Sequence, residues 1–67
     1  MRSRFVQIVL DEVYRRGIVK KEVLVDAVAE RLGIERKKAD DALGIVLQRL
    51  VRKGLITRKG RGYYAKP

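Results

Sequence analysis

Three stretches of the chain carry apolar residues at helical spacing, and each is followed by a glycine: Gly17, Gly33 or Gly54. Glycine is common directly after a helix because, lacking a Cβ atom, it readily adopts the left-handed conformation that closes the last turn. These glycines divide most of the chain into short helical pieces joined by tight turns. We predict helices over residues 3–16, 20–32 and 36–53.

The first predicted helix, with Ser3 as its expected N-cap, is apolar around most of its circumference. One stripe consists of Phe5, Ile8 and Val9, and a second consists of Val6, Leu10, Val13 and Tyr14. A helix of this kind is buried on most sides. In so short a chain we expect the second stripe to meet another copy of the protein, with Val6, Leu10 and Tyr14 at a homodimer interface. The alternative is a wide core face that leaves Leu10 or Tyr14 partly exposed.

The stretch LITRKGRGYYAKP, residues 55–67, has the composition of a β-hairpin. We predict strands over residues 55–58 and 63–66, with glycines in residues 59–62 for the turn. Ile18 and Val19 are β-branched and predict a further short edge strand. Tyr63 and Tyr64 face opposite sides of a strand, so we expect one on the core and one exposed. The predicted fold class is mainly α, with three helices and a small β-hairpin over 55–66.

The 67 residues make one small domain, and the sequence contains no Cys and no His. Disulfides and the commonest zinc ligands are therefore excluded. Asp11–Glu12 and Asp40–Asp41 are adjacent acids, but neighbouring residues of a helix do not face each other, so we expect solvated carboxylates. We expect no enzymatic activity, cofactor, metal or small-molecule ligand. The absence of Asn, Cys, His and Trp is typical of heat-adapted (thermophile) proteins.

Positive charge is unevenly placed along the chain, whose formal net charge is +9. Residues 1–41 carry ten cations and eight anions, whereas residues 42–67 carry seven cations and no anion. A one-signed segment favours an anionic partner; the alternative is that the charge serves solubility alone. The apolar runs are too short to span a membrane, so we expect a cytoplasmic, nucleoid-associated protein.

The chain resembles the winged helix-turn-helix domains over all 67 residues. Its sharpest signature is LQRLVRKGLITRKGRGYYA, in which a helix end leads to a basic glycine turn and a Tyr-containing return strand. The resemblance implies double-stranded DNA as partner, with helix 36–53 in the major groove and the hairpin, the wing, on the phosphate backbone or in the minor groove. The DNA-binding residues that it implies are Arg36, Lys37, Lys38, Gln48, Arg49, Arg52, Arg58, Lys59 and Arg61.

The helix pair in LVDAVAERLGIERKKADDALGIVLQRL is also similar to that of the bacterial histone-like proteins. That family needs a long β-arm after the pair, so we interpret the likeness as two similar helical hairpins. Three functions stay open: a dimeric transcriptional regulator, an architectural DNA binder with little sequence preference, and a module that binds protein or RNA.

Two features of the third predicted helix depart from the winged-helix pattern. Asp40 and Asp41 lie at its exposed start, where carboxylates repel phosphate, and this favours the architectural function. Gly44 lies in mid-helix, where glycine costs about 1 kcal/mol relative to alanine. Close approach of a backbone, from DNA or from another helix, would explain the glycine. The alternative is an exposed residue whose identity has no particular role.

Overall fold

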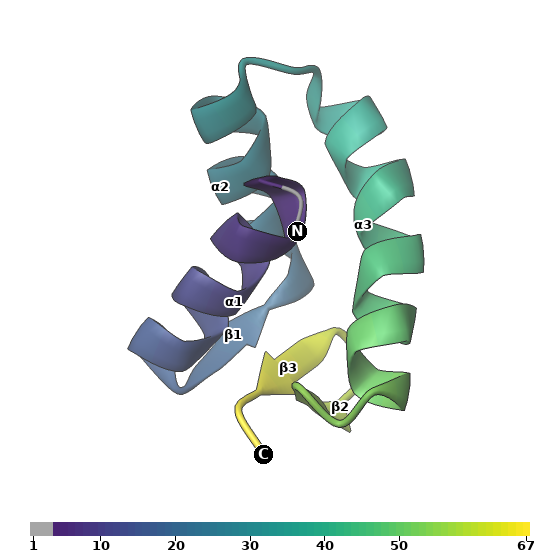
Figure 1. The fold of residues 1–67 in the computed structure, drawn as a ribbon. Coiled ribbons are helices and arrows are strands. Elements are labelled where there is room, and N and C mark those ends of the chain that lie inside the picture. The colour runs from purple at the N-terminus through teal and green to yellow at the C-terminus, as the bar shows by residue number, and fades with distance from the viewer. Residues whose placement is uncertain (1–3) are drawn as a thin grey trace.

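A computed structural model describes residues 4–67, which fold in the order helix, strand, helix, helix, strand, strand (Figure 1). The elements are α1 (Arg4–Arg16), β1 (Ile18–Lys20), α2 (Lys21–Leu32), α3 (Arg36–Arg52), β2 (Thr57–Gly60) and β3 (Tyr63–Ala65). In Figure 1, α1 starts between α2 and α3 and runs below α2, and β2 and β3 lie beside the lower end of α3. The prediction of a mainly helical chain with a small antiparallel sheet is confirmed. No helix in residues 4–67 is long and apolar enough to cross a bilayer.

The predicted helix ends agree with the observed ones to within one residue wherever the structure describes them. Gly17 and Gly33 have the expected positive φ angles of 84° and 65°. At the second of these ends, the Ile34 N–H donates to the Ala29 carbonyl at 3.1 Å. The expected N-cap, Ser3, lies outside the described residues.

The sheet has the strand order β1-β3-β2, and both pairings are antiparallel. The predicted edge strand at Ile18 and Val19 is thereby confirmed. The predicted hairpin bounds were partly wrong: the second strand begins at Thr57, and Gly60 belongs to it. The register shifts between Arg58 and Gly60, and this irregularity leaves only residues 61 and 62 for the turn.

Two hydrogen bonds join the sheet to the helical part of the chain. The Lys21 N–H, at the first residue of α2, donates to the Gly62 carbonyl at 2.8 Å. The Lys66 N–H donates to the Gly17 carbonyl at 3.3 Å. The β2–β3 turn is therefore held directly against the start of α2.

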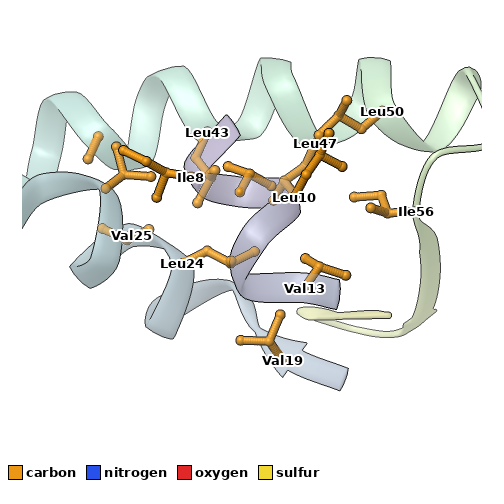
Figure 2. Packing of buried hydrophobic residues seen from close by; sticks show 13 residues of the cluster. Ile8, Leu10, Val13, Val19, Leu24, Val25, Leu43, Leu47, Leu50 and Ile56 are labelled. Carbon is orange, nitrogen blue, oxygen red and sulfur yellow. The ribbon is translucent and has the colours of Figure 1, made fainter. Parts of the chain in front are cut away.

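The core lies where the three helices converge above the sheet (Figure 2). Four apolar residues of α3 are buried: Ala39, Leu43, Leu47 and Leu50. Ala42 and Val46 of the same helix are half-buried. Ile56, which precedes β2 and is 1% exposed, closes the core toward the sheet. The residue was predicted to lie in a strand; it does not pair as one, but it packs in the core.

The second apolar stripe of α1 is largely covered by the chain itself. Leu10 is 8% exposed and Val13 is fully buried, and both belong to the core. Tyr14 is 46% exposed, and its hydroxyl donates to the Leu55 carbonyl at 2.8 Å. Leu10 is therefore buried without a second copy of the chain. The dimer interface at Val6, Leu10 and Tyr14 stays a prediction, in which Val6 and Tyr14 would supply the contacts.

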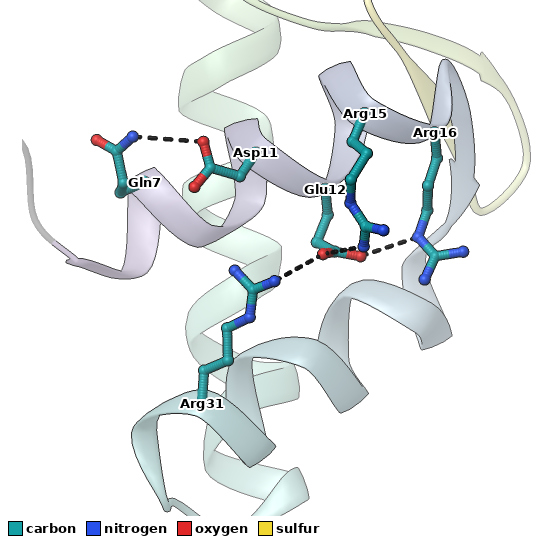
Figure 3. A network of polar contacts seen from close by, with 6 residues as sticks. All are labelled: Gln7, Asp11, Glu12, Arg15, Arg16 and Arg31. Carbon is teal, nitrogen blue, oxygen red and sulfur yellow. Dashed lines mark hydrogen bonds and ion pairs between the residues drawn. The ribbon is translucent and has the colours of Figure 1, made fainter.

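The prediction of a solvated Asp11–Glu12 pair was wrong for Glu12, which is 2% exposed. Its carboxylate accepts hydrogen bonds from Arg15 Nη2 at 2.6 Å, Arg16 Nε at 2.9 Å and Arg31 Nη2 at 3.1 Å (Figure 3). The hydrogen bond from Arg16, assisted by Arg15, lowers the pKa of Glu12 despite the opposing effect of burial. The carboxylate thus stays ionised while it joins α1 to the end of α2.

Candidate nucleic-acid interface

Lys21 lies where three surface grooves meet. The α2–α3 groove, of about 430 Å³, is lined by Lys21, Glu22, Val25, Arg36, Lys37 and Asp40. The turn groove, of about 330 Å³, is lined by Lys20, Lys21, Glu22, Arg61, Gly62 and Tyr63. The sheet groove, of about 340 Å³, is lined by Lys21, Gly44, Leu47, Gln48, Val51, Arg58 and Tyr64. One continuous surface therefore combines the start of α2, one flank of α3 and the β2–β3 hairpin.

The position of Lys21 follows from its bonds on both sides. Its backbone N–H is held by Gly62 of the turn, and its Nζ lies 3.2 Å from Asp40 Oδ1 of α3. The side chain is 35% exposed, so the ammonium group lies at the surface between the two elements. The chain fold thereby places one cation in contact with all three grooves.

The three cations of the hairpin, Arg58, Lys59 and Arg61, are exposed. Arg58 lies opposite Tyr64 in the β2–β3 register, and the two side chains line the sheet groove together. Lys59 lies at the register shift, and Arg61 lies in the turn. Within residues 4–67 none of these three forms an ion pair. Their charge is therefore available to a ligand.

The predicted residues of α3 divide into two groups. Arg36 and Lys37 line the α2–α3 groove, and Gln48 lines the sheet groove. Lys38, Arg49 and Arg52 are exposed but line none of the three grooves. A helix turns about 100° per residue, which places Lys38 and Arg49 more than about 100° around the helix axis from Gly44, a residue that lines the sheet groove. Five of the nine predicted residues therefore line the three grooves, and Lys59, between Arg58 and Arg61 in the hairpin, is a sixth at this surface. The five are Arg36, Lys37, Gln48, Arg58 and Arg61.

Sequence reasoning missed two cations of this surface, Lys20 and Lys21. The Lys20 Nζ lies 5.7 Å from the ring centroid of Tyr63, within range of a cation–π interaction. Tyr63 is 40% exposed, whereas Tyr64 packs against the core, as expected for neighbours in a strand. The Lys-Lys pair after a short strand was visible in the sequence, but its position depends on the pairing of β1 with β3.

Acidic side chains are unequally distributed among the three grooves. Asp40 and Glu22 line the α2–α3 groove, and Glu22 also lines the turn groove. Arg36 is further engaged with Asp26, with Nε 2.6 Å from Oδ1. The sheet groove, by contrast, is lined by two cations and no acid. Because carboxylates repel phosphate, the sheet groove is the part of this surface best suited to an anion.

No group of three or more His, Cys, Asp or Glu side chains within residues 4–67 is arranged to hold a metal ion. Comparison of the chain with protein-family models, with curated proteins and with solved structures found no match.

Proposed function

We propose that the protein is a winged helix-turn-helix protein that binds double-stranded DNA. In this proposal α3 enters the major groove, and the β2–β3 hairpin is the wing that lies on the phosphate backbone or in the adjacent minor groove. A major groove about 12 Å wide admits an α-helix. The 17 residues of α3 give it a length of about 25 Å.

The observation that carries the proposal is the convergence of cations from three elements on one surface. Lys21 of α2, Arg58 of β2 and Arg61 of the turn are brought together there, and the two arginines have no acidic partner in the described chain. A protein that neutralises several phosphates gains affinity because condensed counterions are released. Contact with the phosphates of a duplex would account for the absence of acidic partners of the two arginines.

Asp40 and Asp41 favour binding with little sequence preference as a second candidate within the same class. Both are exposed on α3, and a carboxylate repels the phosphate backbone and can accept hydrogen bonds in the major groove only from the amino groups of cytosine (N4) and adenine (N6). A footprint on genomic fragments separates the two functions. Discrete protected sites would indicate a regulator, and uniform coverage would indicate an architectural protein.

The test of DNA binding is to remove the wing charges in Arg58→Ala/Lys59→Ala/Arg61→Ala and to measure the affinity for a fluorescent duplex at several salt concentrations. We expect a loss of about tenfold or more at moderate salt, and a shallower slope of log K against log salt, by about 0.9 for each phosphate that the variant no longer neutralises. The matched control is Arg4→Ala/Lys53→Ala/Lys66→Ala, which removes the same charge from exposed positions outside the grooves. Equal affinities for the two triple variants would refute a wing that contacts DNA.

A further inference from the structure

We propose that the sheet groove holds one phosphodiester of the DNA backbone, and that residue 44 is glycine because a side chain there would occupy this place. The inference rests on the proposed function and assigns to it a contact point between α3 and the wing. The DNA would be held here by Lys21, Gln48 and Arg58, which come from α2, α3 and β2.

Packing within the chain gives no reason for glycine at position 44. The residue is exposed in mid-helix and has no positive φ angle. A Cβ atom added there would have only one neighbour within 4 Å, the Lys21 Nζ at 4.0 Å, which is ordinary van der Waals contact. Since no backbone atom of another described helix lies within that distance, close helix packing in one chain does not explain the glycine. The space beside Gly44 is open groove.

The walls of that groove match the chemistry of a nucleic-acid backbone. Lys21 and Arg58 supply two cations from different elements, and the Gln48 amide supplies a hydrogen-bond donor one turn after Gly44. Val51 and Tyr64, which are half-buried, supply apolar surface of the kind on which a sugar can pack. A phosphate between the two cations would meet no acid of the groove itself.

Asp40 adjoins this place and opposes an anion there. It lies one helical turn before Gly44, and it pairs with Lys21 at 3.2 Å. When a phosphate enters, Lys21 interacts with two anions, and the repulsion between Asp40 and the phosphate lowers affinity. Removing the carboxylate charge should therefore strengthen binding while leaving the groove open.

The experiment measures duplex affinity and urea unfolding for Gly44→Ala and Gly44→Leu, with Gln7→Leu as the control for an added exposed leucine on a helix. We expect the urea midpoint of Gly44→Ala to rise, because alanine favours the helix. We expect affinity to fall several-fold for alanine and about tenfold or more for leucine, with a salt slope shallower by about 0.9 because one phosphate fewer is neutralised. Asp40→Asn should bind several-fold more tightly, and Gln7→Leu should bind as the wild type does.

The outcomes separate this inference from the proposed function. If the wild-type protein binds duplex and Gly44→Leu binds equally well with an unchanged salt slope, the inference is overturned and DNA binding stands. If the wing triple variant binds no worse than its matched control, the proposed function fails, and the phosphate site fails with it. A more stable Gly44→Ala protein that binds DNA less tightly would support the inference, because loss of folding could not explain the result.

Discussion

At the scale of single residues, Glu12 is the buried charged side chain of the described chain, whereas the side chains of its three arginine partners are 45–62% exposed. In Glu12→Gln the amide keeps one oxygen acceptor but directs an NH₂ group at cations, so charge-assisted hydrogen bonds are lost. We expect the free energy of unfolding at neutral pH to fall by about 1–3 kcal/mol, as measured by urea titration. Asp11→Asn, at the exposed neighbouring position, should change it by about 0.5 kcal/mol or less.

The same carboxylate should make stability depend on pH in the acid range. Because the pKa of Glu12 is lowered in the folded state, its contribution is complete above the unfolded-state pKa of about 4.3 and is lost as pH falls through the lower folded-state value. The difference in stability between wild type and Glu12→Gln should therefore shrink below about pH 4. A difference that stays constant down to the acid transition would contradict the assigned shift.

Part of this cluster could have been predicted from the sequence. Glu12 lies four residues after Ile8, on the stripe expected to face the core, and Arg15 and Arg16 follow it at helical spacing. The third partner, Arg31, could not be predicted, because its approach depends on how α1 packs against α2. The same holds for Lys21, whose place in the surface is set by the distant Gly62.

At the scale of elements, helix bounds followed from local signals, whereas the bounds of β2 and the strand register did not. Glycines and apolar spacing mark helix ends within a few residues of the chain, so α2 and α3 were predictable. The pairing of β1 with β3 joins residues more than forty positions apart, and the shift at Lys59 moves the turn. Neither the register nor this irregularity can be deduced from local composition. The prediction therefore started β2 two residues too early, at residue 55 instead of Thr57.

The β2–β3 turn offers a test of how the hairpin is attached to the helices. Gly62 has a φ angle of 77°, and its carbonyl accepts from the first residue of α2. We expect Gly62→Ala to lower the free energy of unfolding by about 1 kcal/mol or more, because a Cβ atom disfavours the left-handed region. Gly60→Ala is the matched control: Gly60 has no positive φ and nothing within 4 Å of an added Cβ. Equal losses in urea titrations of the two variants would show that the turn conformation is not what matters.

At the scale of the whole molecule, the chain has a formal net charge of +9, and its described part spans only 29 × 27 × 20 Å. The Debye length is about 10 Å at 0.1 M salt and about 3 Å at 1 M, so at low salt the cations repel one another across much of this distance. Of the 16 cationic side chains in residues 4–67, five form ion pairs within that range. Repulsion should therefore outweigh the attraction of these pairs, and folding should be weakest in dilute buffer.

Together with the proposed function, this balance predicts opposite effects of salt on folding and on the proposed DNA binding. Raising NaCl from about 50 to 500 mM should increase the free energy of unfolding by about 1 kcal/mol, because screening relieves the repulsion. The same change should weaken binding to duplex steeply, because counterion release contributes less. The Arg58→Ala/Lys59→Ala/Arg61→Ala variant, with three fewer positive charges at unpaired positions, should be more stable than wild type at low salt and should gain less from added salt. If the wild type and the variant showed the same salt dependence of unfolding, these three hairpin cations would not repel the rest of the free protein. Binding of a polyanion to them would then relieve no repulsion within the protein.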